Sequence, residues 1–92
     1  MRPLVFALLL VPVAAAAAWT PPDIVAYVQR RAGCNHWGGE EPYDKARAAE
    51  INKTMAKFSC NTLDADEKTL LRRYRSTPAF LQQIRAARQA LP

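Results

Sequence analysis

Two cysteines, Cys34 and Cys60, constrain the fold of this 92-residue chain more than any other feature. A domain of this size buries only about 60% of the surface that its unfolded chain exposes, so its core alone gives marginal stability. Only one intramolecular disulfide is possible, and it closes a loop of 27 residues. Such a crosslink contributes about 3–4 kcal/mol by reducing the entropy of the unfolded chain. We therefore expect one small domain that is crosslinked by a Cys34–Cys60 disulfide, as is usual in oxidising compartments.

The N-terminal segment, residues 1–18, has the pattern of a secretory signal peptide. Arg2 provides a positive start, residues 4–13 form an apolar run interrupted by Pro12, and alanines at 14–18 provide the small residues of a cleavage site. The apolar run is shorter than the roughly 20 residues that cross a bilayer. We expect cleavage after Ala18 and a periplasmic or secreted domain of residues 19–92 without a transmembrane segment. The alternative is a buried N-terminal helix.

Apolar residues recur at helical spacing after residue 19, and no stretch alternates with the period of a β-strand. Four segments are expected to be helical: residues 21–32, 42–59, 64–75 and 77 onward. The stripe of the second is Ala48, Ile51, Met55 and Phe58, and that of the last is Phe80, Leu81, Ile84, Ala87 and Leu91. Thr20 is the expected N-cap and Gly33 the expected end of the first, while Asp64 and Glu67 resemble a capping box in the third. The predicted fold is all-α, a single small domain of about four short helices.

The segment between the first two predicted helices, residues 33–44 (GCNHWGGEEPYD), concentrates side chains that suit recognition. Trp and Tyr are favoured as anchors of protein interfaces, and neighbouring carboxylates suit a basic partner. We therefore predict a binding surface formed by His36, Trp37, Glu40, Glu41 and Tyr43. The alternatives are that the tryptophan belongs to the core, that the acids only stabilise the positive end of a helix, and that the glycines only permit unusual backbone angles.

Metal binding and catalysis are less favoured at this segment. A zinc site usually has three or four protein ligands, whereas the chain has one histidine and Cys34 is expected to be oxidised. A Cys–His nucleophile pair needs a free thiol, and the adjacent Glu40 and Glu41 point in different directions. We expect no cofactor, no bound metal and no enzymatic activity. A metal or catalytic site at His36, Glu40 and Glu41 is one alternative hypothesis.

Positive charge is concentrated near the C-terminus. The chain has a formal charge of +5, and the last two predicted helices contain Arg72, Arg73, Arg75, Arg85 and Arg88. If these arginines share a face, that face suits an anionic lipid or polymer of the cell envelope. The alternative is an ordinary solvated helix face. No nucleic-acid partner is expected, because the chain lacks interleaved aromatic and basic residues and an exported protein rarely meets nucleic acid.

The run CNHWGGEEPYD (residues 34–44), followed by Cys60 and by LLRRY (residues 70–74), resembles a type of small exported proteobacterial helical protein of uncharacterised function. The shared pattern is Cys-x-His-aromatic, Gly-Glu, Tyr-Asp and a second Cys, and it covers about half of the chain. The resemblance implies export and a helical fold and transfers no catalytic residue. The general layout is also similar to that of small periplasmic lysozyme-inhibitor proteins. The leading hypothesis is thus a non-enzymatic, exported binding or inhibitor-like protein with a protein partner.

Overall fold

The structure, a computed structural model, describes residues 19–92, and the predicted signal peptide lies outside the described residues. Its elements are α2 (Pro22–Gly38), α3 (Lys45–Lys57), the 3-10 turn η2 (Cys60–Thr62), α4 (Leu63–Arg73), α5 (Pro78–Ala86) and the 3-10 turn η3 (Ala87–Gln89). Residues 19–92 contain four α-helices and no strand, which confirms the predicted all-α class. Among these helices, none has the length and apolar character needed to cross a membrane.

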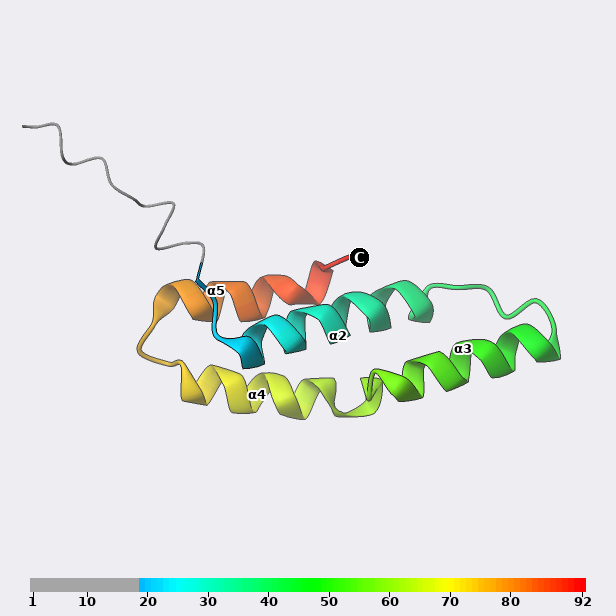
Figure 1. Ribbon diagram of the computed structural model, residues 1–92, viewed down its shortest axis with the longest axis horizontal. Helices are drawn as coiled ribbons and strands as arrows, with labels where there is room; N and C mark the ends of the chain where they lie inside the picture. The colour runs from blue at the N-terminus through cyan, green and yellow to red at the C-terminus, as the bar shows by residue number, and fades with distance from the viewer. Residues whose placement is uncertain (1–18) are drawn as a thin grey trace, which may run out of the picture.

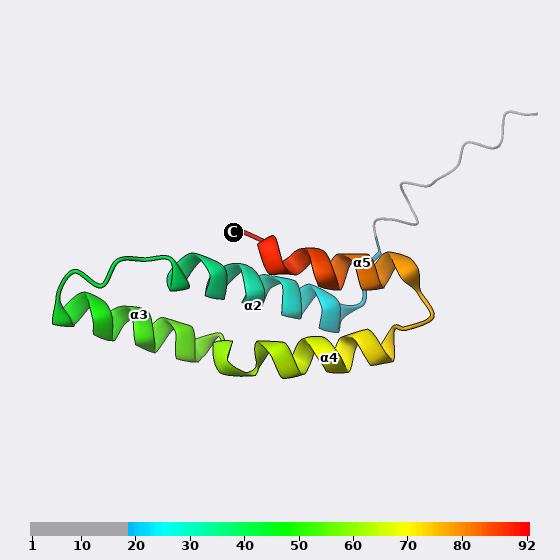
Figure 2. The same ribbon diagram turned by 180° about the vertical axis from the view of Figure 1, so that it is seen from behind.

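The long helix α2 belongs to two parts of the molecule (Figures 1 and 2). Its N-terminal half lies beside α4 and α5, and these three segments form what we call the body. Its C-terminal half lies beside α3, and this antiparallel pair forms what we call the arm. Helices α3 and α4 follow one another nearly in line along the same side of α2, so the short break between them decides how the arm leaves the body.

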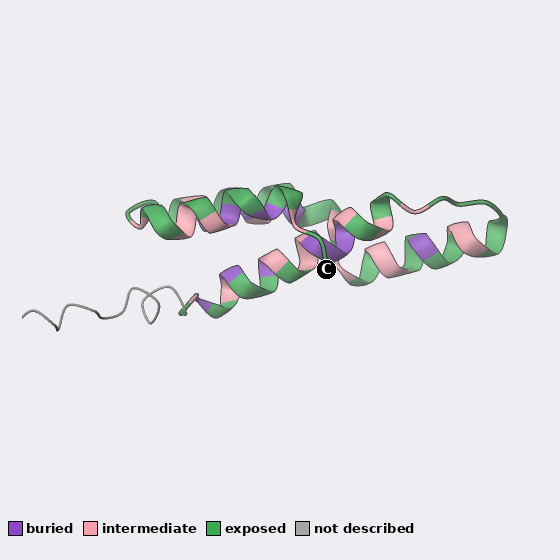
Figure 3. Ribbon diagram, turned by 90° about the horizontal axis from the view of Figure 1, so that it is seen from above, coloured by how far each residue is buried: buried purple, intermediate pink, exposed green. Residues whose placement is uncertain are grey.

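The hydrophobic core lies in the body, where three helices face one another (Figure 3). Its most deeply buried side chains are Ile24 and Tyr27 of α2 and Ile84 of α5, each at most 2% exposed. Helix α3, in contrast, buries only Ile51. Since burial of apolar surface provides most of the stability of a small domain, the body carries the fold and the arm depends on it.

An ion pair and a hydrogen bond fasten the start of α2 to the end of α4. Asp23 accepts hydrogen bonds from the Tyr74 hydroxyl, at 2.8 Å, and from the Arg73 guanidinium. Burial alone would raise the pKa of Asp23, but these two donors outweigh burial and hold the pKa below its usual value. The carboxylate therefore stays ionised at neutral pH and links the two helices.

The break between α3 and α4 is crosslinked to the middle of α2. The predicted Cys34–Cys60 disulfide is present, with 5.7 Å between the two Cα atoms. One turn earlier on α2, Arg30 donates to the backbone oxygens of Phe58 and Ser59, at 2.9 and 3.0 Å, and to the Asp66 carboxylate at 2.9 Å. Phe58 is the C-cap of α3, a position where a helix leaves carbonyl oxygens without internal donors, and Ser59 follows it. The hydrogen bond from Arg30 also lowers the pKa of Asp66.

The predicted end of the first helix at Gly33 is wrong, because α2 continues to Gly38. None of the glycines in residues 19–92 has a positive φ, so the expectation that they serve unusual backbone angles is also wrong. Gly33 instead allows close packing: a Cβ atom at this position would lie 2.7 Å from Cζ of the Phe58 ring. The glycine thus marks a close approach between α2 and the end of α3.

Two predicted helix starts differ from the structure. Pro21, not Thr20, is the N-cap of α2, and no side chain caps this helix. Helix α3 begins at Lys45, later than predicted, because the Asp44 carboxylate accepts the backbone N–H of Arg47 at 2.7 Å and sets the N-cap there.

The predicted capping box of the third helix is wrong as well. Thr62 is the N-cap of α4, and Glu67 is a buried residue, 3% exposed, that accepts two hydrogen bonds from Arg88 at 2.6 and 2.8 Å. Asp64 pairs with Arg31 of α2 at 3.3 Å. Both acids therefore serve contacts between helices. In the last helix, the predicted stripe holds except for Leu91, which lies beyond η3 and is 73% exposed.

We predict that replacing both cysteines with alanine lowers the free energy of unfolding by about 3–4 kcal/mol, because the unfolded chain regains the entropy of the open loop. Urea denaturation of the oxidised protein, of the Cys34→Ala/Cys60→Ala variant and of the reduced wild type provides the measurement. The reduced wild type should match the variant. Equal stability of all three proteins would contradict the importance of the crosslink.

We predict that Gly33→Ala is destabilising by about 1 kcal/mol, although alanine is favoured over glycine by a similar amount within a helix. The new methyl group would have to displace the Phe58 ring. In a Phe58→Leu background the same substitution should become stabilising. A double-mutant cycle measured by thermal denaturation tests this coupling, and additive effects would show that the close approach is unimportant.

Candidate binding site on the arm

The arm leaves the body at Asn35. The side-chain amide of Asn35 donates to the backbone oxygens of Arg88 and Ala90, at 3.0 and 2.9 Å, and so binds the C-terminal end of α5 and η3 to α2. After this point α3 is the helix that packs against α2, and the loop of residues 39–44 forms the far end of the molecule (Figure 1). The predicted site residues all follow Asn35, so the fold places them on the arm.

The structure places two predicted site residues in the last turn of α2 and three in the following loop. His36 is exposed, and the edge of its ring meets Trp37 with 5.6 Å between ring centroids. In the loop, Glu41 is exposed and Tyr43 is 74% exposed, the largest exposed fraction among the large hydrophobic residues of the described chain. An exposed tyrosine at the end of an arm is positioned for contact with another molecule.

Trp37 is held in place by Arg47 of α3. The guanidinium carbon lies 5.1 Å from the centroid of the indole ring, a cation–π geometry. The same guanidinium forms ion pairs with Glu40 in the loop and with Glu50 in α3. The hydrogen bond with Glu50, opposed by burial and helped by Glu40, raises the pKa of Arg47 above its ordinary value. Trp37 is half-buried and contributes one face to the arm's surface.

A mostly apolar hollow of about 400 Å³ lies beside this tryptophan. It is lined by Trp37, Gly38, Glu40, Pro42, Ala48, Ile51, Asn52 and Met55. A second hollow of about 550 Å³ continues along α3 toward the disulfide, lined by Asn52, Met55, Ala56, Cys60 and Asn61. The two hollows share Asn52 and Met55 in their linings, and we call the first, beside Trp37, the arm groove.

The arm groove contains only part of the predicted site. Trp37 and Glu40 line it, whereas His36, Glu41 and Tyr43 do not. The groove also contains residues that sequence reasoning assigned to the apolar stripe of α3, namely Ala48, Ile51 and Met55. The role of Arg47 was missed. Its spacing of seven residues from Glu40 gave no local signal, because the loop between them folds back.

The hypothesis of a metal or catalytic site at this turn has little geometric support. Within residues 19–92, His, Cys, Asp and Glu side chains form no group of three or more that would hold a metal ion. Cys34 is bonded to Cys60, and Glu40 is engaged with Arg47. The arrangement instead offers an aromatic surface, a shallow apolar groove and the exposed carboxylate of Glu41, which are features that suit recognition.

Comparisons with protein-family models, with curated proteins and with solved structures find no match to this chain. The interpretation of the arm therefore depends on its own geometry and chemistry.

We predict that Trp37→Ala lowers the free energy of unfolding by about 1–2 kcal/mol, because the ring is half-buried, whereas truncating a fully buried aromatic residue costs about 3–5 kcal/mol. Tyr27→Ala, which removes a ring that is 2% exposed, is the matched control. Urea denaturation of both variants provides the comparison. Equal losses would assign Trp37 to the core and remove it from the site.

Proposed function

We propose that this protein is an exported, non-enzymatic binding protein that recognises a partner protein with the tip of its arm, residues 36–43. The observation that carries the proposal is the combination at this tip of a 74% exposed tyrosine with an immobilised tryptophan at the edge of an apolar groove. Aromatic residues that are held rigidly before binding lose little entropy when a partner docks.

The crosslink supports this role, because it immobilises the base of the arm. Cys34 lies two residues before His36 on the same helix, and its partner Cys60 directly follows the end of α3. The disulfide also suits export, since such bonds persist in oxidising compartments, and the N-terminal pattern of Arg2 and the apolar run suits a signal peptide. A rigid, projecting tip is equally suited to an inhibitor that blocks the surface of an enzyme.

The chemistry of the tip indicates what the partner presents. The arm groove accepts an apolar side chain, and Glu41 is an exposed carboxylate that forms no ion pair within residues 19–92. Glu40 is already neutralised by Arg47. We therefore expect the partner surface to combine an apolar side chain with a lysine or arginine, which would meet Glu41.

We predict that Tyr43→Ala/Glu41→Gln abolishes partner capture and changes the free energy of unfolding by less than about 0.5 kcal/mol, since both side chains are exposed. The experiment is affinity capture by the oxidised protein from an extract of the cells that make it. Mass spectrometry identifies the captured proteins, and titration with the purified partner measures affinity.

Trp19→Ala is the matched control, because Trp19 is another exposed aromatic residue, 62% exposed, at the far end of the body. This control should bind the partner like the wild type. If the Tyr43→Ala/Glu41→Gln variant captures the same proteins with the same affinity, the tip is not the binding surface.

A further inference from the structure

Acidic residues are absent from the last part of the chain. From Lys68 to Pro92 the sequence contains six lysines and arginines and no aspartate or glutamate. Two of the six form ion pairs with acids from elsewhere in the chain: Arg73 pairs with Asp23 and Arg88 with Glu67. Arg73 and Arg88 therefore hold the fold together, and Arg72, Arg75 and Arg85 remain of the five C-terminal arginines.

The four remaining cations of this part form no ion pair with a described residue and are exposed: Lys68, Arg72, Arg75 and Arg85. Without these four, residues 19–92 contain eight cations and eight acids. The number of these four cations equals the positive excess of the described chain, while three further unpaired lysines, Lys45, Lys53 and Lys57, lie on α3. We call them the cationic face.

Helical geometry places two of these cations, Lys68 and Arg72, one turn apart on one side of α4. Arg75 follows in the turn after α4, which ends at Arg73. Two contacts with α2 lie on one side of α4, where Asp66 pairs with Arg30 and Arg73 with Asp23. Lys68 lies on the other side of the buried Glu67. One turn before Lys68, Asp64 is already paired with Arg31 of α2.

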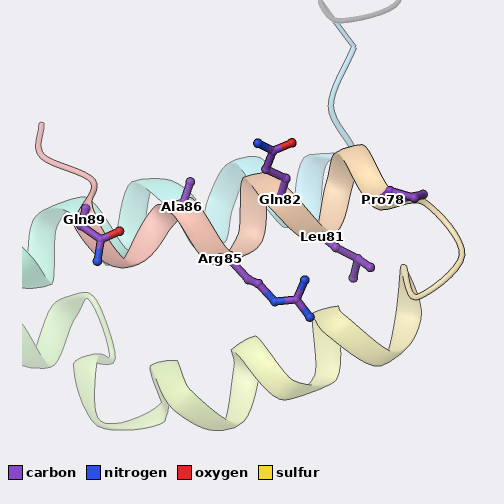
Figure 4. A pocket seen from close by; sticks show the side chains of 6 residues that line it. All are labelled: Pro78, Leu81, Gln82, Arg85, Ala86 and Gln89. Atoms are coloured by element: carbon purple, nitrogen blue, oxygen red, sulfur yellow. The ribbon is translucent and has the colours of Figure 1, made fainter.

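The fourth cation, Arg85, lies on α5, which is packed beside α4. Glu67 binds Arg88, and Tyr74 meets Phe80 with 5.4 Å between ring centroids, so these two helices are neighbours. Figure 4 shows Arg85 extending from α5 toward α4, with Leu81 on the same side of the helix. The cationic face therefore spans two helices of the body.

Apolar groups accompany the charges. Arg85 borders a shallow hollow of about 430 Å³ whose lining is Pro78, Leu81, Gln82, Arg85, Ala86 and Gln89 (Figure 4). Three of the four cations are arginines, whose planar guanidinium groups bind phosphate oxygens in pairs. A surface that combines guanidinium groups with exposed apolar side chains matches the headgroup region of a phospholipid bilayer, where phosphates lie beside the first acyl groups.

From these observations we propose that the cationic face binds the surface of membranes that contain anionic phospholipids. A soluble polyanion would be bound by charge alone and would have no use for the apolar hollow beside Arg85. Binding to the bilayer is peripheral and electrostatic, so it weakens as salt screens the charges. The face lies on the body, and the tip of the arm takes no part in it.

The test is sedimentation of the oxidised protein, as isolated from the cells that make it, with vesicles of phosphatidylcholine alone or mixed with phosphatidylglycerol. We expect binding only to the anionic vesicles. Each substitution of a cationic-face residue by glutamine should lower the partition constant about fivefold. The combined variant Lys68→Gln/Arg72→Gln/Arg75→Gln/Arg85→Gln should lose binding by more than about a hundredfold.

The matched control is Lys45→Gln/Lys53→Gln/Lys57→Gln, which removes three exposed, unpaired lysines from α3. It should bind anionic vesicles within about fivefold of the wild type, the effect of one charge. If both variants lose binding equally, or if the wild type binds soluble polyphosphate but no vesicle, the proposal is wrong. Should the combined variant fail to fold by circular dichroism, the pair Lys68→Gln/Arg75→Gln provides the same comparison. The Tyr43→Ala/Glu41→Gln variant should bind vesicles normally, which separates this surface from the tip.

Discussion

The break between α3 and α4 is the constraint on which the rest of the structure depends. Ser59 adopts a left-handed backbone conformation there, with φ of 51°, which costs free energy for a residue other than glycine. Two contacts from neighbouring turns of α2 oppose this cost: the Cys34–Cys60 disulfide and the guanidinium of Arg30, which donates to the carbonyls of Phe58 and Ser59 just after α3. A charged donor at a helix C-terminus is doubly favourable, because it satisfies backbone acceptors and complements the helix dipole. The arm is thereby fixed to the body at one point, although α3 buries only Ile51.

This arrangement separates the hydrophobic core from the surface that we propose for recognition. The body contains the core, and the arm projects from it. One aromatic residue of the arm, Trp37, is fixed by its neighbours, and another, Tyr43, is exposed. Trp37 owes its position to Arg47, whose own position is determined by two carboxylates, so the groove is formed before any partner binds. Tyr43, in contrast, makes little contact with the rest of the chain. A surface with one fixed ring and one free ring combines low entropic cost with adaptability.

The fold class and the crosslink could be predicted from the sequence, because helical periodicity is a local property and two cysteines leave one pairing. The errors concern residues whose partners are distant in sequence. Gly33 has the local signature of a helix end, but its role is set by Phe58 on another element. Glu67 completes a plausible capping box, yet it is buried against Arg88, which is 21 residues away. The sequence could predict that the site residues lie together on one segment. It could not predict the groove, since the groove exists only when Trp37 and α3 meet.

Charge in this protein is divided between two uses. The arginines that form ion pairs all connect different elements or hold a loop: Arg30, Arg31, Arg47, Arg73 and Arg88. The cationic face forms no ion pair within residues 19–92, and its members repel one another. Lys68 and Arg72 are four residues apart on α4, a like-charge spacing that destabilises a helix by a few tenths of a kcal/mol. Residues that slightly oppose the fold do not serve stability, because the paired arginines already meet the structural need, and this supports the proposed role of the cationic face.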